Sequence, residues 1–525
     1  MVTKRLLVLI ASVVLVGCGS HPPGKPSNTL IYGRGEDSKT LDPINGETGE
    51  TVKVLVNLYD NLVAFRDDST EVEPALATSW ETSEDGLKWT FHLREGVRFH
   101  DGTPVDAEAI IFSLNRLRQD DNPNVSDPAR PYKPNFAVIK DIRAVDPSTV
   151  EFELRESSAV FLNNLAMFPA GIVSPTAVKK LGKNFSTNPV GTGPFRFERW
   201  IRDQQLVLAA NEQHWRGRPN LDRVVFVPVS ESATRIQQLV RGEIHIADNL
   251  PPAEVDALAK QPGLTVVEEI SMNVAYLAMQ MDKPPLDDVR VRQAIARALD
   301  KQALIRVAYV GHAESAVNLL PKAMWGHNDD IRDRPFDTEA SRELLQAAAD
   351  DKGFELPLTL SLAVMSEPRP YMEQPLQVAA FVKDSLAEIG INLTIEPKPV
   401  TPHFAKMMRG DYQIGLAGWT TDNGDPDNFL YSLLDLENIS DSGNNMSHYR
   451  NEEVHELLLA AQRELDQDKR LSLYKKVQEL VFIDAPIVPL VSTKQRAVHT
   501  SRLKDYRLHP AMLIRLRKAR FEDVR

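Results

Sequence analysis

The chain has 525 residues, and its 61 lysines and arginines against 73 aspartates and glutamates give a formal net charge of -12 at pH 7. An acidic chain without a basic patch is a poor partner for nucleic acid, because phosphates require clustered lysine and arginine. With 42% hydrophobic residues the chain can bury several cores, so we expect two or three domains. Its single cysteine, Cys18, excludes an internal disulfide, a cysteine metal cluster and a dithiol redox pair.

The N-terminus has the order of a secretory signal. Lys4 and Arg5 precede an apolar run over residues 6–16, and the small residue Gly17 follows directly. The run is far shorter than the roughly 20 apolar residues that cross a bilayer. We therefore predict a signal peptide over residues 1–17 and an extracytoplasmic protein.

The residues around Cys18 resemble the bacterial lipobox, in which the cysteine is acylated and becomes the new first residue. Lipidation at Cys18 would anchor the protein to a membrane, and residues 18–28, rich in proline and glycine, would form a flexible tether. The alternative is an ordinary signal peptide with an incidental cysteine. No later segment is long and apolar enough to cross a membrane, so we expect membrane contact through the lipid anchor only.

From residue 29 the hydrophobic pattern alternates between strands and helices. Strands are expected near residues 29–32, 89–93, 150–154, 224–229, 273–279, 392–396 and 412–417. Helices are expected over 52–62, after an N-cap at Asp106, after Asp287 or Asp288, over 376–389 before Gly390, and twice between 452 and 482. This alternation predicts an α/β fold of open sheets covered by helices, with ligands bound beyond strand ends or between domains.

The motifs of common enzymes are absent from the sequence. We find no G-x-S-x-G elbow, no H-E-x-x-H zinc helix and no P-loop. His455-Glu456 is followed by leucines, and Gly191-Thr192-Gly193 lacks the third glycine of a dinucleotide loop, so it is interpreted as a tight turn. We therefore predict a protein that is not an enzyme and has neither a metal nor another cofactor.

Four segments carry a family resemblance. They are PALATSW at 74–80, DGLKWTFHLREGVRFHDG at 85–102, VGTGPF at 190–195 and VRVRQAIARALD at 289–300. Together they resemble the bacterial extracellular solute-binding proteins of the peptide and nickel class, family 5, which serve ABC importers. The resemblance extends along nearly the whole body after residue 28, and most of these residues are expected to be structural.

The resemblance implies a two-lobed periplasmic-binding-protein fold with a hinge (type II-like, cluster C) and an extra subdomain in the first lobe. The implied first lobe is discontinuous and comprises residues 29–61, 186–275 and 485–525. The extra subdomain would comprise 62–185 and the second lobe 276–484. A ligand would favour a closed state of the lobes, and a monomer would pass the ligand to an ABC permease in the cytoplasmic membrane.

Two later segments resemble the dipeptide-binding branch of the family, RPY at 369–371 and GWTTDNGDPDNF at 418–429. The resemblance implies that Arg369 holds the α-carboxylate of a peptide and Asp422 its α-ammonium. Trp419 and Tyr371 would form pocket walls, and Thr48 would touch the ligand from the first lobe.

The chemistry agrees with these two roles. A dipeptide is a zwitterion whose ends lie within about 7 Å when extended. A guanidinium and a carboxylate at fixed separation would therefore select peptide length and tolerate many side chains.

Other interpretations stay open. Arg369 can be a surface arginine, Asp422 a turn residue that satisfies backbone groups, and Trp419 and Tyr371 core residues. The same scaffold serves oligopeptides, nickel chelates, haem and antimicrobial peptides, and residues 272–277 and 283–286 resemble the antimicrobial-peptide branch. Relatives often carry a cysteine pair that residues 433–451 lack, which leaves length selection open. A lipid-anchored peptidase is the alternative from another class, and the missing zinc and serine motifs disfavour it.

Overall fold

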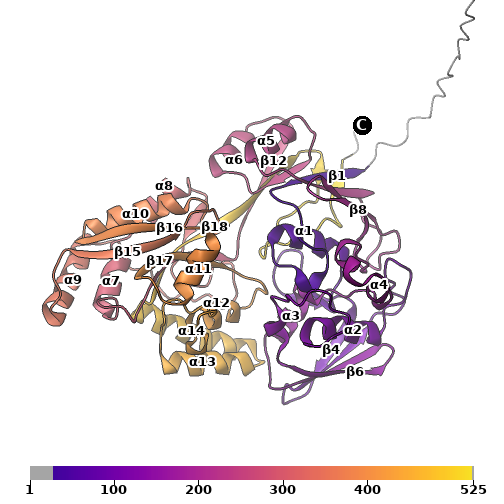
Figure 1. The fold of residues 1–525 in the computed structure, drawn as a ribbon, viewed down its shortest axis with the longest axis horizontal. Helices are drawn as coiled ribbons and strands as arrows, with labels where there is room; N and C mark the ends of the chain where they lie inside the picture. Colours follow the sequence, from indigo (N-terminus) through magenta and orange to yellow (C-terminus); the bar gives the residue numbers. More distant parts are fainter. Residues whose placement is uncertain (1–27, 523–525) are drawn as a thin grey trace, which may run out of the picture.

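The computed structural model describes residues 28–522. The predicted signal peptide, Cys18 and all of the predicted tether except Asn28 lie outside the described residues. Figure 1 shows two bodies joined by strands that cross between them at the top of the view. Within the described residues, no helix combines the length and the apolar character that a membrane span requires.

One 12-stranded sheet runs through both bodies. We call the body at the left of Figure 1 the second lobe, built on β16 (Ile391–Lys398), β15 (Leu358–Met365), β17 (Ile414–Thr420) and β13 (Asn273–Met279). The first lobe is built on β11 (Ile246–Asp248), β1 (Thr29–Arg34), β10 (Arg223–Pro228), β9 (Gln205–Ala210) and β8 (Phe195–Ile201).

A single long strand, β18 (Ile487–Thr500), belongs to both lobes. Its first part pairs with β13 and with β14 (Ala313–Ser315), and its second part pairs with β11 and with β12 (Leu264–Ile270). The chain also passes directly from β12 to β13. The lobes are therefore joined by two neighbouring passages. The residue boundaries expected for the lobes stay a prediction.

Helices cover both faces of the second-lobe sheet. Leu277 and Met279 of β13 pack on one face, and Tyr276 and Ala278 pack on the other. A strand buried on both faces is almost continuously apolar, as β13 is after Asn273. The helices are α7 (Val289–Arg297), α8 (Lys301–Ala308), α9 (Thr338–Lys352), α10 (Pro375–Ala387), α11 (Val400–Met408), α12 (Asp427–Leu434), α13 (Glu452–Arg463) and α14 (Gln467–Asp484).

A separate four-stranded antiparallel sheet lies beside the first lobe, at the lower right of Figure 1. We call this unit the four-stranded subdomain. It consists of β4 (Ala77–Thr82), β5 (Lys88–Leu93), β7 (Thr149–Leu154) and β6 (Ile139–Asp146), with α2 (Ala107–Arg118) and α3 (Phe161–Ala166). Edge-to-face contacts among Phe91, Phe152 and Phe161, with ring centroids 5.2–6.4 Å apart, fill its core.

The remaining elements connect these units. They are α1 (Gly49–Leu58), α4 (Pro175–Leu181), α5 (Ser232–Val240), α6 (Pro252–Leu258), the pairs β2 (Val63–Phe65) with β3 (Val72–Pro74) and β19 (Leu503–Lys504) with β20 (Arg520–Phe521), and 3-10 turns at Pro43–Asn45, Lys133–Phe136, Phe168–Ala170, Gly182–Thr187 and Leu436–Asn438.

Helix caps explain where the expected helices begin and end. The Asp106 side chain accepts from the Ala109 N–H at 2.9 Å, which confirms that cap, and Asp288 caps α7. For the helix expected over 52–62, both predicted ends are wrong, because α1 spans Gly49–Leu58. Its N-cap is Thr48, whose hydroxyl accepts from the Thr51 N–H, and it stops at Leu58 because Tyr59 is extended.

Candidate functional site

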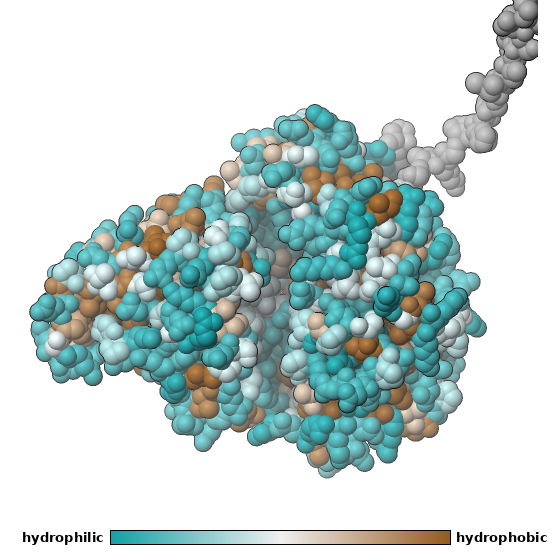
Figure 2. Space-filling view, viewed as in Figure 1, coloured by the Kyte–Doolittle hydropathy of each residue, from teal (hydrophilic) through white to brown (hydrophobic). Residues whose placement is uncertain are grey.

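The loops that carry Arg369 and Asp422 leave the same edge of the second-lobe sheet. β15 and β17 are parallel neighbours, with Leu362 opposite Ile414. β15 leads through residues 366–374 to α10, and β17 leads through 421–426 to α12. Because the carboxyl ends of parallel strands meet at one edge, the structure brings the two residues to the same side of the sheet. Figure 2 shows a groove between the lobes.

Asp422 lies at the contact between the two bodies. The Tyr132 hydroxyl, beside the four-stranded subdomain, donates a hydrogen bond to its Oδ1 at 3.1 Å. Its backbone N–H donates to Oδ1 of Asn428 at 3.2 Å. Burial raises the pKa of the Asp422 carboxyl from 3.8 to about 6, against the hydrogen bonds from Tyr132 and Asn428. Since no cation within residues 28–522 pairs with it, this carboxylate is electrostatically suited to an incoming cation.

The segment that follows Asp422 is held from across the groove. Asn163 donates to the carbonyl oxygen of Asn423 at 2.9 Å, and the Asn423 amide donates to Asn164 Oδ1 at 2.9 Å. At Gly424, φ is +67° and an added Cβ would lie 2.2 Å from Cβ of Thr70, so only glycine fits. These contacts fix the loop of Asp422 relative to the first lobe.

A buried ion pair holds the same loop from the second-lobe side. Asp425 accepts two hydrogen bonds from Arg470 of α14, at 2.8 and 3.0 Å, and both side chains are almost inaccessible. Next to it, burial and then the Asp425 charge raise the pKa of Asp427 to about 7. The pair fixes the loop, because its two bonds share one planar fork geometry.

The loop of Arg369 is fastened to the crossing strand β18. The backbone groups of Arg369 and Met372 exchange two hydrogen bonds, at 2.9 and 3.0 Å, which form a tight turn. Thr493 of β18 donates to the carbonyl oxygen of Pro370 at 2.8 Å, and Arg496 pairs with Glu373. Arg369 itself is exposed and forms no ion pair within the described part of the chain, so its guanidinium can bind an anion.

Of the two aromatic candidates, Tyr371 lies in the loop of Arg369 and Trp419 lies near the end of β17. Tyr371 is only 4% exposed, and its ring lies on Gly418, where an added Cβ would be 2.2 Å from a ring carbon. Burial raises the pKa of its hydroxyl, against the nearby Arg369 charge. The Trp419 indole donates to Asn428 Oδ1 at 3.0 Å, the same atom that receives the Asp422 N–H. Their role as pocket walls stays a prediction.

On the first-lobe side, Thr48 has a structural task as the N-cap of α1. Its neighbour Glu47 lies close enough to Tyr132 to contribute to the raised pKa of that hydroxyl. The start of α1 therefore lies near Asp422, but contact between Thr48 and a ligand stays a prediction. Sequence reasoning missed Tyr132 and Asn163, because nothing in their own polar segments indicates a partner about 260–290 positions away.

The arrangement suits binding of a zwitterion. The Asp422 carboxylate and the Arg369 guanidinium lie on loops that leave the same sheet edge. Neither has an ion-pair partner among residues 28–522. Within the same residues, no group of three or more histidine, cysteine, aspartate or glutamate side chains is placed to hold a metal. Complementary charges at fixed separation can orient a ligand with an ammonium at one end and a carboxylate at the other.

Comparison with known proteins adds a family context. A model described as bacterial extracellular solute-binding proteins, family 5 Middle, matches residues 71–441. The dipeptide-binding protein of Escherichia coli (strain K12) is 32% identical over 515 residues, covering 95% of this chain and 94% of that protein. Heme-binding protein A of Haemophilus influenzae is 36% identical over 535 residues, covering 95% and 96%.

A solved structure is similar over the same extent. The periplasmic binding protein DppA from Helicobacter pylori, in complex with the peptide STSA, aligns with a TM-score of 0.80 at 32% identity. The alignment covers 95% of this chain and 98% of that one. These likenesses confirm the predicted fold class.

Proposed function

Because this chain belongs to family 5 of the bacterial extracellular solute-binding proteins, we propose that it captures short peptides in the groove between its lobes and delivers them to an ABC permease. The observation that carries the proposal is the placement of Asp422 and Arg369 at one sheet edge, each without an ion-pair partner among the described residues. The peptide ammonium binds Asp422 and the peptide carboxylate binds Arg369. Each charged hydrogen bond contributes about 1.5–3 kcal/mol.

The proposed site takes groups from both bodies. Tyr132 approaches Asp422 from the first-lobe side of the groove, so a bound ammonium would meet groups from both bodies. A ligand that contacts both lobes binds the closed state better and so favours closure. We further propose that Cys18 is acylated and holds a monomer at the outer side of a membrane, where the permease receives the peptide.

Calorimetric titration of residues 19–525 with a free dipeptide, and with its N-acetylated and C-amidated forms, tests the proposal. The free dipeptide is expected to bind about 10- to 160-fold more tightly than either blocked form, because each block removes one charged contact worth about 1.5–3 kcal/mol. In Arg369→Gln the free and amidated forms are expected to bind alike. An exposed arginine of α8, Arg306, provides the matched control, and Arg306→Gln should retain the full difference.

Equal binding of free and blocked peptides would contradict the two-charge clamp and indicate an oligopeptide cleft. The 36% identical heme-binding relative makes haem the second candidate ligand. Titration with haemin under the same conditions distinguishes haem from peptide as the ligand. A shifted haem absorption band that survives Arg369→Gln, together with no heat from any peptide, would favour haem.

Peptide affinity is expected to fall in mild acid. The Asp422 pKa of about 6 means that the carboxylate present at pH 7.5 is mostly protonated at pH 5. A neutral carboxyl loses its attraction for an ammonium, so the dissociation constant should rise about tenfold between these pH values. Across this range the peptide carboxylate stays charged, and the ammonium, with a pKa of about 7.7–8.0, is mostly charged at pH 7.5 and fully charged at pH 5. A des-amino analogue of the same peptide, which has no ammonium, should show no such weakening.

A further inference from the structure

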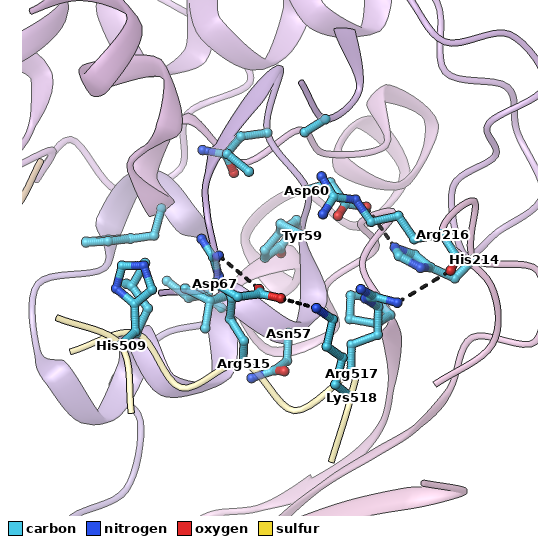
Figure 3. A pocket seen from close by; sticks show the side chains of 18 of the residues that line it. Asn57, Tyr59, Asp60, Asp67, His214, Arg216, His509, Arg515, Arg517 and Lys518 are labelled. Carbon is cyan, nitrogen blue, oxygen red and sulfur yellow. Dashed lines mark hydrogen bonds and ion pairs between the residues drawn. The ribbon is translucent and has the colours of Figure 1, made fainter. Parts of the chain in front are cut away.

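A second cavity, of about 380 Å³, lies in the first lobe and has no lining residue from the loops of Arg369 and Asp422. Its walls come from the C-terminal half of α1, the β2–β3 hairpin, residues 166–168, Pro194, the β9–β10 loop with residues 214–220, and the last segment of the chain, residues 505–518. No residue of the second lobe's sheet or helices contributes to it, so it is separate from the groove that carries Arg369 and Asp422. Figure 3 shows basic side chains from several segments gathered around it.

The cavity is basic although the chain as a whole is acidic. The cationic side chains that line it are Arg216, Arg507, Arg515, Arg517 and Lys518. The acidic side chains are Asp60, Asp67 and Asp505. The cavity therefore concentrates cationic side chains in a chain whose net charge is -12.

The acids do not neutralise all of these cations. Asp67 is shared by Arg515, at 3.4 Å, and Lys518, at 2.6 Å, as Figure 3 shows. Asp505 pairs with Arg520, which is not part of the lining, at 2.7 Å. Asp60 accepts hydrogen bonds from the Thr192 hydroxyl and the Trp215 indole, and Nε2 of His214 lies 3.4 Å from it.

Two arginines remain without a carboxylate. Arg216 has Glu73 at 2.8 Å, but neither Arg507 nor Arg517 forms an ion pair within residues 28–522. Among the described residues, the Arg517 guanidinium donates to the carbonyl oxygen of Arg216 alone, at 3.4 Å. The lining as a whole has five cationic and three acidic side chains, so its formal excess is two positive charges.

Buried groups in the lining report the same positive environment. Burial and then the Arg515 charge lower the pKa of His509 to about 4. Burial lowers the pKa of Arg515, and the charge of Arg216 adds to the effect. His214, with 1% of its side chain exposed, has Nε2 3.4 Å from Asp60, while its Nδ1 atom has no hydrogen-bond partner among the described residues. A bound anion would relieve this crowding of positive charge.

We propose that this cavity is a binding site for a dianionic oxyanion of the phosphate class, with Arg507 and Arg517 as its main ligands. Two unpaired guanidinium groups match a charge of about -2, and their planar donor sets fit tetrahedral phosphate oxygens. The phosphate can be free, in a small phosphomonoester, or in a lipid headgroup. The site is independent of the peptide clamp.

Calorimetric titration with inorganic phosphate, balanced with chloride at constant ionic strength, tests the site. The wild-type chain is expected to bind with a dissociation constant in the region of ~1 mM. The double variant Arg507→Gln/Arg517→Gln should bind at least about tenfold more weakly, because charged hydrogen bonds are removed. Neither arginine holds a carboxylate in the fold, so the variant should stay folded.

The matched control is Arg306→Gln. Arg306 lies on α8 in the second lobe and does not line the cavity, so this variant should bind phosphate like the wild type. Vesicles of phosphatidic acid in phosphatidylcholine identify the source. If the wild-type protein sediments with these vesicles and the double variant does not, the ligand is a lipid headgroup. If the wild-type protein does not sediment with them, the ligand is a soluble phosphate. No phosphate heat up to about 50 mM together with no vesicle binding, or equal binding by the double variant, would overturn the proposal. Dipeptide affinity should be unchanged in every variant, so failure of this site and failure of the clamp are distinguishable.

Discussion

Asp422→Asn is expected to weaken binding of a free dipeptide by roughly 100-fold or more, as measured by calorimetric titration at pH 7.5. The amide has almost the same shape as the carboxylate but carries no charge, so the peptide ammonium loses its only anionic partner in the proposed clamp. Removal of one member of a charged, partly buried pair typically costs about 2–5 kcal/mol. The variant should also lose the pH dependence of binding, since the titrating group is gone.

The same substitution should not destabilise the ligand-free protein. The pKa of Asp422 is raised on folding, from 3.8 to about 6, so burial of this carboxyl costs stability at every pH above that range. Asparagine removes the cost, and the melting temperature at pH 7.5 is expected to stay equal or to rise. A lower melting temperature would mean that the loss of binding reflects a damaged fold. Asp441→Asn, at an exposed position nearby in the chain, is the matched control and should change neither property.

Asp425→Asn is expected to lower the free energy of unfolding by about 3–5 kcal/mol, as measured by urea denaturation. The substitution leaves Arg470, of which 6% is exposed, as a buried charge without its carboxylate. Breaking a buried pair from one side is costly because the remaining charge has already lost its hydration. The loop of Asp422 should also loosen, so peptide affinity falls together with stability.

A second variant separates the lost ion pair from lost packing. In Asp425→Asn/Arg470→Met the guanidinium left without its carboxylate is removed as well, so part of the lost stability should return. Full recovery is not expected, because Arg470 also donates to the carbonyl oxygen of Ala461 and lies over the Trp325 ring at 4.9 Å. If Asp425→Asn unfolds at the same urea concentration as the wild type, the buried pair does not hold this loop.

The sequence by itself determined the local elements and the residue types of the clamp. The cap at Asp106 could be predicted because its hydrogen bond spans only three residues. β13 could be predicted because its seven residues are almost all apolar. The segments around Arg369 and Asp422 could be singled out through a family resemblance, whose fold the comparisons confirm and whose site roles stay a prediction.

Only the tertiary structure decided which distant groups meet. Tyr132 and Asp422 are 290 positions apart, and their hydrogen bond depends on how two bodies pack rather than on any local pattern. The helix expected to reach residue 62 ends at Leu58, close to where Gly193 packs against the Leu58 backbone. The basic cavity likewise joins α1 to the last segment of the chain. Periodicity and capping act over a few residues, whereas these contacts arise when the whole chain buries its apolar surface and places polar groups together.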